Sequence, residues 1–506
     1  MTWLFILLGL WIWWISGYKY RKRMRQIAKE LPTTIPAMPL VGHAYILMGN
    51  DEDRMKGLQK FGRDAIRQGG TIGYWLGQDL NIAVADPEVA DLILKNCLTK
   101  HEKIMNCIRI FTGNGSLAAP VHVWRPRRKI LSPIFSPRNL NAFVEIFAKQ
   151  SATMVELLRP MVAAGDFSIW KYVATYTFDA VTETNLGVKM NSQKNMDHPY
   201  LDAFDKCVSF IGARILSPWL HPNVIYRMVP SYRQCKDCVS YIDKFVGKTI
   251  SEKRKAVNGL RGKIENDAME PKKTRTLVEL LMDAPENERK LDDLELLEES
   301  KVIISAGTDT SAIGACNTLL MLARHPKVQE AVYKELHEVF GDSDRQATVE
   351  DLSRLKYLEM VIKESLRMYP PVPAVVREPI DDIKLPNGTT LTKGIAIVVY
   401  IWAVHRNPHY WGDDADSFRP ERFLEPLKHP AQFIPFSWGM RNCLGYQYAM
   451  LSLKTVTSTI LRRYQVLPPA DLDPAHYEDP LRVRFKIMMM DVDNFMVRLK
   501  ERVWMS

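Results

Sequence analysis

Cysteine is scarce in this chain, which has seven in 506 residues. Their positions form no disulfide framework of the kind that stabilises small secreted proteins, and this scarcity suits a catalytic domain in the reducing cytosol. Cys235 and Cys238 have the C-x-x-C spacing, but no second pair completes a zinc site and no βαβ pattern surrounds them for redox chemistry. We therefore assign no function to this pair.

The chain also lacks internal repeats, low-complexity tracts and any linker between about residues 55 and 465, where apolar periodicity is almost unbroken. One large domain is therefore expected. The net charge is +10, from 68 basic and 58 acidic side chains. No zinc finger and no stripe of basic and aromatic residues accompanies this charge, so the sequence predicts no nucleic-acid partner.

The first 20 residues differ in composition from the rest of the chain. Residues 3–18 carry no charge and include four tryptophans, and basic residues follow from position 19. The alternative, a cleaved signal peptide, needs positive charge before the apolar run and small residues at the cleavage site. The observed order favours a membrane anchor over residues 1–20 that suits the thin endoplasmic reticulum bilayer, with the following chain in the cytosol. We expect residues 21–45 to be a basic, proline-rich linker and residues 46–506 to be the catalytic domain.

Long amphipathic patterns dominate the chain and predict a mainly α fold with small β-sheets, an α+β architecture. Helices are expected at about 136–160, 167–187, 233–257, 292–324, 327–340 and 352–368, with another after residue 443. Shorter strand-like segments lie near 70–86, 395–402 and 485–492.

One loop combines five informative residues, namely Phe436, Gly439, Arg441, Cys443 and Gly445. Cys443 could be a small buried hydrophobe, as most free cysteines are. The glycines, however, permit a tight turn and the close approach of a flat ligand, and the helix expected just after the loop would stabilise a thiolate. An arginine at position 441 can pair with a carboxylate. A thiolate beneath a flat cofactor that carries carboxylates describes haem.

This loop resembles the haem-binding loop of the cytochrome P450 superfamily, and further motifs across residues 30–500 agree with it. The overall pattern is similar to microsomal animal members, in particular the insect branch related to fatty-acid hydroxylases. The resemblance implies the cytochrome P450 fold, preceded by one N-terminal transmembrane helix. It also implies haem b, with Cys443 as the iron ligand. Many relatives have glutamate at position 306 and bind haem covalently through it; Ala306 cannot form that ester, so the Cys443–iron bond would be the only covalent link.

A second motif lies within the helix expected at 292–324. Ala306 and Thr310 are four residues apart and share a face, while Asp309 lies among apolar residues and would be buried. These could be polar residues tolerated by packing alone. The segment resembles the oxygen-activation segment of the family, which implies that Thr310 donates a hydrogen bond at the oxygen-binding face and that Asp309 relays protons from solvent. A widened helical turn there would make room for oxygen.

Two further groups of residues resemble family motifs. Glu364 and Arg367 are three residues apart on one predicted helix, and with Arg422 they would form a buried ion network with a structural role. A second group would bind the haem propionates: Trp124, Arg128, Arg377 and Arg441. Arginine suits a planar carboxylate better than lysine does.

The resemblance implies a membrane-bound monooxygenase that hydroxylates a hydrophobic small molecule, whether fatty acid, hormone, odorant or xenobiotic. No flavin or nicotinamide domain is visible, so electrons would come from a separate NADPH–cytochrome P450 reductase, with cytochrome b5 as a second donor. The reductase would dock on the basic residues Arg125, Arg127 and Lys129. The enzyme would be single-pass in the endoplasmic reticulum membrane, with its catalytic domain on the cytoplasmic face. Two alternatives are a haem-thiolate isomerase or dehydratase, and a haem binder without turnover.

Overall fold

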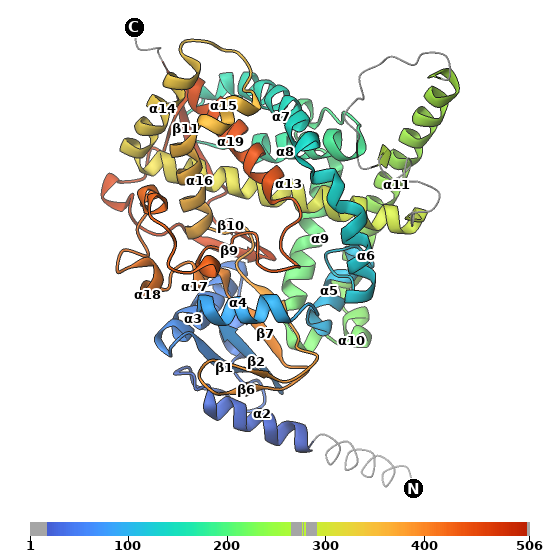
Figure 1. Cartoon of the computed structure of the whole chain (residues 1–506), viewed down its shortest axis with the longest axis vertical. Coiled ribbons are helices and arrows are strands. Elements are labelled where there is room, and N and C mark those ends of the chain that lie inside the picture. The colour runs from blue at the N-terminus through green and yellow to red at the C-terminus, as the bar shows by residue number, and fades with distance from the viewer. Residues whose placement is uncertain (1–17, 265–275, 277, 280–290, 503–506) are drawn as a thin grey trace.

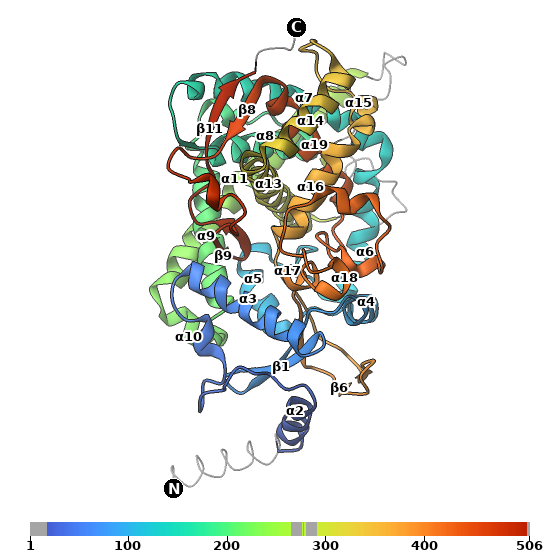
Figure 2. The ribbon, with the colours of Figure 1, turned by 90° about the vertical axis from the view of Figure 1, so that its left-hand side faces the viewer.

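The structure is a computed structural model that describes residues 18–264, 276, 278–279 and 291–502. Most of these residues are helical, and small sheets complete the fold, as the sequence predicts (Figures 1 and 2). The anchor expected over residues 1–20 lies outside the described residues except for its last three. Within the described ranges no helix is both long and apolar enough to cross a bilayer.

The helices of the structure include all seven that the sequence predicts, six of them close to the predicted bounds, and others that it does not predict. Those of the first half are α2 (Tyr18–Glu30), α3 (Asp51–Arg67), α4 (Pro87–Asn96), α5 (Glu102–Thr112), α6 (Val121–Leu131), α7 (Pro137–Leu158), α8 (Trp170–Leu186), α9 (Pro199–Ile215), α10 (Asn223–Met228) and α11 (Pro230–Ile264). Those of the second half are α13 (Asp293–Arg324), α14 (Pro326–Phe340), α15 (Val349–Arg354), α16 (Lys356–Met368), α17 (Ile401–Val404), α18 (Pro408–Trp411) and α19 (Tyr446–Arg463).

The largest sheet of the described residues has the strand order β1-β2-β7-β4. Its strands are β1 (Thr71–Leu76), β2 (Asp79–Val84), β7 (Ala396–Val399) and β4 (Val375–Arg377), and only the β2–β7 pair is parallel. The smaller sheets are formed by β3 (Phe167–Ser168), β11 (Met496–Glu501) and β8 (Tyr464–Leu467), by β9 (Val483–Lys486) and β10 (Met488–Asp491), and by β5 (Ile383–Lys384) and β6 (Thr390–Leu391).

Helix α13 crosses the middle of the molecule and packs against α8, α16 and α19 (Figures 1 and 2). It begins with a capping box, in which the Asp292 and Glu295 side chains accept hydrogen bonds from each other's backbone N–H groups. Gly307 is a poor helix former, but packing explains it. A Cβ there would lie 2.8 Å from Val181 Cγ2 on α8. Glycine therefore lets the two helices approach closely at the centre of the fold.

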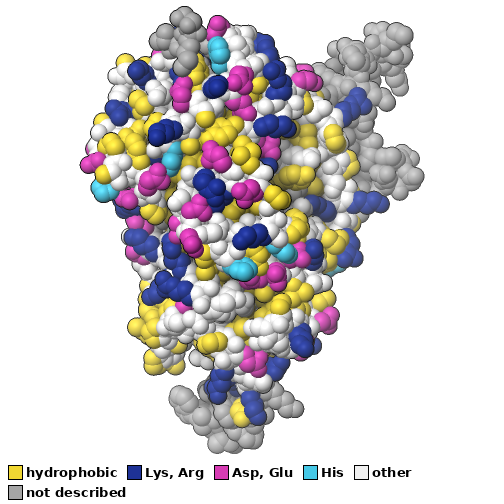
Figure 3. Space-filling model, turned by 60° about the vertical axis from the view of Figure 1, so that its left-hand side comes forward, with side chains coloured by type: hydrophobic (Ala, Val, Ile, Leu, Met, Phe, Trp, Pro, Cys, Tyr) yellow, Lys and Arg dark blue, Asp and Glu magenta, His cyan; other side chains and the backbone are white. Residues whose placement is uncertain are grey.

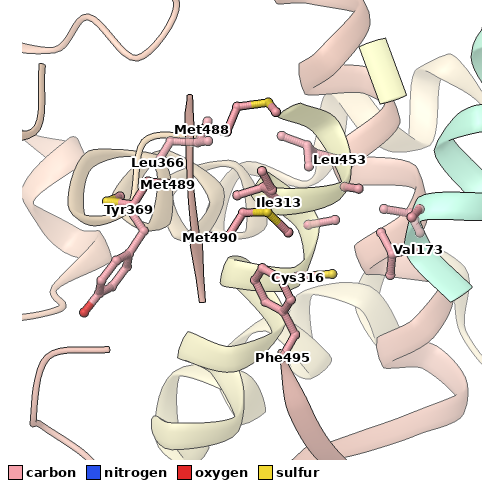
Figure 4. Packing of buried hydrophobic residues seen from close by; sticks show 14 of the residues in the cluster. Val173, Ile313, Cys316, Leu366, Tyr369, Leu453, Met488, Met489, Met490 and Phe495 are labelled. Carbon is pink, nitrogen blue, oxygen red and sulfur yellow. The ribbon is translucent and has the colours of Figure 1, made fainter. Parts of the chain in front are cut away.

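Two apolar clusters hold these layers together. The larger surrounds α13, where Met488, Met489 and Met490 of β10 pack beside Ile313 and Cys316 (Figure 4). The second cluster packs against the four-stranded sheet and includes buried side chains of α2. Part of the segment expected to be a linker is thus a helix that packs on the sheet. On the face seen in Figure 3, acidic and basic side chains are interleaved rather than separated.

Three of the predicted elements have different bounds. Residues 485–492 were expected to form one strand, but the chain turns at Ile487, whose φ of 63° breaks the run into β9 and β10. The strand expected at 395–402 ends at Val399, and α17 begins two residues later. The helix expected at 352–368 is two helices, α15 and α16. An apolar run cannot locate such breaks, because buried strands, turns and helices can all be apolar.

Candidate active site

The loop around Cys443 is a series of tight turns that ends at the start of α19. The Cys443 N–H donates to the Phe436 carbonyl at 2.8 Å, and the Asn442 N–H donates to the Gly439 carbonyl at 3.1 Å. Gly445 is the N-cap of α19, so the helix begins just past the cysteine, as predicted. The sulfur therefore lies near the positive end of a helix, which favours a thiolate.

Cys443 differs from the other six cysteines, which are buried or half-buried, because it is accessible. It nevertheless lies deep in the protein, and burial raises the pKa of its thiol. The Gly445 N–H and the Arg128 guanidinium act in the opposite direction and lower that pKa. An accessible sulfur that is remote from the outer surface faces space inside the fold, as a ligand to a bound group must.

The two glycines of the loop have different roles. Gly439 has a φ of 71°, and a Cβ there would lie 2.4 Å from the Leu94 carbonyl oxygen. Both the backbone conformation and the contact with α4 therefore require glycine. Gly445 has a φ of −94°, and a Cβ there would make only an ordinary contact with Phe135. No described protein atom requires glycine at position 445.

Three of the residues predicted to bind carboxylates meet beside this loop. Arg128 donates from Nη1 to the Asn442 carbonyl and from Nη2 to the Asn442 side-chain oxygen, both at 2.8 Å. The Arg441 guanidinium lies 4.3 Å from the centre of the Trp124 ring and donates to the Ala119 carbonyl. Helix α6 thus supplies Trp124 and Arg128, while the cysteine loop supplies Arg441.

Arg377 joins this group from β4. Burial lowers the pKa of Arg377 to about 10. Burial, followed by the charges of Arg377 and Arg128, lowers the pKa of Arg441 to about 10 as well. Among the described residues, Arg377 Nε and Arg441 Nε and Nη1 are buried without a hydrogen-bond partner.

Sequence reasoning missed one member of the cluster, Lys100, which precedes α5. Its ammonium donates to the Leu117 carbonyl at 2.6 Å. Burial, then the charges of Arg377 and Arg441, lowers its pKa well below the usual value. Nothing in the local sequence marks this lysine, because only the fold brings it to the two arginines.

The basic cluster and the thiol together fit the group that the loop predicts. Buried cations with unpaired N–H groups are costly unless an anion satisfies them. Two carboxylates on a flat ligand would accept these bonds while Cys443 approached the centre of the ligand. The donors thus match haem, with its two propionates and its iron.

Helix α13 supplies the other predicted residues. Ala306 is exposed and Thr310 half-buried, although most of their helix is buried, so this side of α13 also faces accessible space inside the fold. The Thr310 hydroxyl donates to the Ala306 carbonyl at 2.5 Å. The helix is α-helical throughout, so the widened turn expected there is absent. The Thr310 hydroxyl instead back-bonds to a carbonyl that already belongs to the regular helix.

Asp309 is buried, as its apolar surroundings predict. Burial, and then the charge of Asp205, raises its pKa to about 7, while Lys486 acts in the opposite direction. Asp205 lies on α9 and pairs with Lys486 of β9 at 3.0 Å. The Asp205 side chain is 52% exposed, so charged groups extend from the vicinity of Asp309 towards solvent.

The buried ion network predicted around Glu364 is confirmed. Glu364 pairs with Arg367 at 2.7 Å and with Arg422 at 2.8 Å, and all three side chains are buried. Arg367 also donates to the carbonyls of His405 and Ala415. The network thus joins α16 to the chain that leads into the cysteine loop.

His405 continues this connection, and sequence reasoning missed it. Burial lowers its pKa to about 3, so the imidazole is neutral. Its Nδ1 bonds the Arg367 carbonyl at 3.1 Å, and its Nε2 accepts from the Ile434 N–H at 2.8 Å. Ile434 lies two residues before Phe436, so this histidine fixes the start of the cysteine loop.

The prediction that Arg127 belongs to a basic docking surface is wrong. Its side chain is buried and pairs with Glu295, Glu298 and Glu299 of α13. The arginine therefore ties α6 to α13, because it lies on the inward side of α6. Arg125 and Lys129 of the same helix are exposed.

Comparisons with known proteins agree with this geometry. The family model for cytochrome P450 matches residues 32–490. Cytochrome P450 4c21 of Blattella germanica is 34% identical over 453 residues, covering 88% of each chain. Cytochrome P450 4V2 of Homo sapiens is 30% identical over 491 residues, covering 96% of this chain and 92% of the relative. Cytochrome P450 4d2 of Drosophila melanogaster is 32% identical over 453 residues, covering 85% of this chain and 87% of the relative. The chain therefore belongs to the cytochrome P450 family, and it is a monooxygenase that uses haem with a cysteine thiolate as the iron ligand.

Proposed function

We propose that this monooxygenase hydroxylates a hydrophobic small molecule at a site between Cys443 and the Ala306–Thr310 side of α13. The observation that carries the proposal is that the Cys443 thiol and this side of α13 are both accessible from inside the fold. Bound haem supplies the chemistry of dioxygen reduction and insertion into a C–H bond. The substrate class stays broad: fatty acid, hormone, odorant and xenobiotic all match an apolar pocket.

Cys443 is the iron ligand, and the basic cluster holds the carboxylates. Arg128, Arg377 and Arg441 donate to the propionates, and Trp124 supports Arg441 by stacking. Phe436, Gly439 and Gly445 shape the loop beneath the ring. Ala306 has no carboxyl group to form an ester, so the haem is haem b held without a bond to its edge.

Asp309 and Thr310 transfer protons from solvent towards the site. A carboxyl with a pKa near 7 both takes up and releases a proton at neutral pH, which suits a relay. Protons pass from solvent past Lys486 and Asp205 to Asp309, and from there towards Thr310. The Thr310 hydroxyl must turn its hydrogen away from the Ala306 carbonyl to donate into the site.

The test of these roles is coupled turnover. The full chain is reconstituted in phospholipid vesicles with NADPH–cytochrome P450 reductase, and NADPH consumption and oxygenated product are measured over a panel of apolar compounds. We expect Thr310→Ala to lower product per NADPH at least severalfold. Thr308→Ala is the matched control, because the Thr308 hydroxyl is buried and donates to the Ile304 carbonyl. Unchanged coupling in Thr310→Ala would contradict the role given to Thr310.

We also propose that the enzyme is held on the cytoplasmic face of the endoplasmic reticulum membrane. An anchor over residues 1–20 precedes a basic segment over 21–45 and the catalytic domain over 46–506. Support comes from the half of the molecule that carries α2 (Figures 1 and 2), where α10 exposes 74% of Val224 and 81% of Met228. Exposed apolar side chains at one end suit contact with lipid.

A fluorophore that reports polarity tests this orientation. On Val224→Cys its emission should shift to the blue when the protein moves from detergent into vesicles. Leu424→Cys is the control, since Leu424 is 70% exposed on a different segment. Equal shifts at both positions, or none at residue 224, would contradict the lipid contact.

Electrons come from the reductase, with cytochrome b5 as a second donor. Arg125 and Lys129 are the exposed cations of α6 near the cysteine loop, and an acidic partner surface complements them. Charge reversal at both positions should raise the reductase concentration needed for half-maximal turnover. The effect should fade at high salt, because surface charges are screened there.

A further inference from the structure

Two cysteines that are distant in sequence face each other across helices α9 and α11. The sulfur atoms of Cys207 and Cys235 lie 3.8 Å apart. Both side chains are fully buried. Cys238, the sequence neighbour that completes the C-x-x-C spacing, is half-buried one turn further along α11. The fold thus pairs Cys235 with a residue that the sequence motif does not contain.

A positive charge lies beside this thiol pair. Arg214 of α9 is buried and stacks on the Tyr226 ring, with its guanidinium 4.0 Å from the ring centre. Its guanidinium donates hydrogen bonds to neutral oxygens of Leu220, His221 and Asn223. A buried cation bonded to neutral acceptors favours a nearby anion.

The Tyr226 hydroxyl could donate a hydrogen bond to such an anion. The Tyr226 hydroxyl is buried without a hydrogen-bond partner of normal geometry among the described residues. It adjoins Cys235, and the contacts with Cys207, Tyr226 and Arg214 lower the pKa of the Cys235 thiol. A nearby positive charge favours the thiolate, which is the reactive form of cysteine.

We propose that Cys207 and Cys235 are a redox pair that forms a disulfide and thereby ties α9 to α11. The oxidant is hydrogen peroxide. The Cys235 thiolate attacks one peroxide oxygen, so an S–O bond forms, the O–O bond breaks, and the departing hydroxide takes up a proton. Cys207 then attacks the oxidised sulfur, loses its proton and expels the second oxygen as water. The two thiols lose two electrons and two protons, and one peroxide becomes two waters.

The disulfide would close the segment between α9 and α11 into a loop. Residues 216–229, including α10 and the 3-10 turn Pro218–Leu220, connect the two helices. Helix α9 also carries Asp205 and Tyr200, and the Tyr200 hydroxyl bonds Ser305 of α13 at 3.1 Å. A disulfide would therefore fix α11 to a helix that is itself bonded to the central helix. No group of three or more His, Cys, Asp or Glu side chains in the described ranges could hold a metal, so a metal site does not explain the pair.

The holoenzyme is treated with stoichiometric hydrogen peroxide, its free thiols are alkylated after unfolding, and non-reduced peptides are mapped by mass spectrometry. We expect one cross-linked peptide that joins Cys207 to Cys235, with loss of two of the seven thiols. The oxidised protein should also melt several degrees higher, because the bond restricts the unfolded chain. A reductant should reverse both changes.

The variants separate this pair from the other thiols. Cys207→Ala and Cys235→Ala should each abolish the cross-link and the shift in melting temperature, whereas Cys238→Ala should retain both. Full alkylation of Cys207 and Cys235 after oxidation would overturn the proposal, as would a cross-link between Cys235 and Cys238. If a variant fails to fold, the peptide map of the oxidised protein without substitutions is sufficient to decide whether the Cys207–Cys235 disulfide forms.

Discussion

Two groups of buried arginines near the cysteine loop differ in how well they are paired. In the first, Arg367 and Arg422 share the Glu364 carboxylate, and their other hydrogen bonds go to backbone carbonyls and, from Arg422, also to the Asp414 side chain. In the second, Arg377 and Arg441 lie near Lys100, and three guanidinium nitrogens have no partner among the described residues. The paired charges of the first group tie segments of the fold together, while the unpaired N–H groups of the second remain available to a ligand.

The largest effect is expected on stability, when the carboxylate that the first group shares is removed. Glu364→Gln leaves the buried Arg367 guanidinium without a counter-ion and Arg422 with Asp414 alone, which should cost about 3–5 kcal/mol of stability. Thermal or denaturant unfolding should show the loss in the presence and absence of haem. Asp414→Asn is the control: Asp414 also pairs with Arg422, but its side chain is 41% exposed, so the loss should stay within about 1 kcal/mol. Equal losses would remove the distinction between buried and exposed pairs.

Removing an arginine of the second group should weaken haem binding and leave the stability of the haem-free protein unchanged. Arg441→Ala deletes a buried guanidinium whose Nε and Nη1 lack partners without the ligand, so the stability of the haem-free protein should not fall. Haem binding should weaken by about 1.5–3 kcal/mol, the usual value of a hydrogen bond to a charged group. Haem transfer to a scavenger protein measures this.

Arg125→Ala on the exposed side of α6 is the control for that change and should leave haem transfer unaffected. If Arg441→Ala destabilised the haem-free protein as strongly as it weakened haem binding, Arg441 would belong with the structural group.

Asp309 extends the comparison to a buried charge of the opposite sign. Its pKa of about 7 in the folded state exceeds the ordinary value of 3.8, so the folded protein binds the proton more tightly than the unfolded chain does. Stability is therefore lost as pH rises from about 4 to about 7. An asparagine at this position does not titrate. The free energy of unfolding of Asp309→Asn, taken relative to that of the natural chain, should therefore rise by about 2 kcal/mol from about pH 5.5 to about pH 8.5.

Unfolding of both proteins at several pH values measures this gain. A difference that stayed constant across the range would mean that Asp309 is ionised or protonated throughout, and the relay would lose its support. Asp202→Asn provides the control for surface charge, because that side chain lies on the same helix as Asp205, is 65% exposed and pairs with Lys206.

The smallest effect is expected at Lys100. Lys100→Met should weaken haem binding by about 1 kcal/mol, because one charged donor of several is lost. Lys103→Met is matched to it, as Lys103 is 51% exposed and pairs with Asp79. An equal loss of haem affinity in Lys103→Met would show that net charge, rather than position, governs binding.

The sequence predicted what local patterns encode. The loop at 436–445, the helix that follows it and α13 all carry their signals within a few residues. The Glu364–Arg367 spacing likewise indicated the ion network. In these places the residues that matter are neighbours in the chain.

Long-range placement explains what was missed. Arg127 looks like its exposed neighbours, and only the packing of α6 against α13 shows that it is buried. Lys100, His405 and the Cys207–Cys235 pair depend on segments that meet only in the folded chain. The turn at Ile487 lies inside an apolar run whose periodicity gave no sign of a break.

The most direct test of the account is the carbon monoxide difference spectrum of the reduced full-length protein, recorded beside Cys443→Ser. The account predicts a strongly red-shifted Soret band that the variant lacks, because only a thiolate ligand produces that shift. Arg125→Ala should keep the band. A band at the position typical of histidine-ligated haem in the natural chain, or an unchanged red-shifted band in Cys443→Ser, would contradict the claim that Cys443 holds the iron.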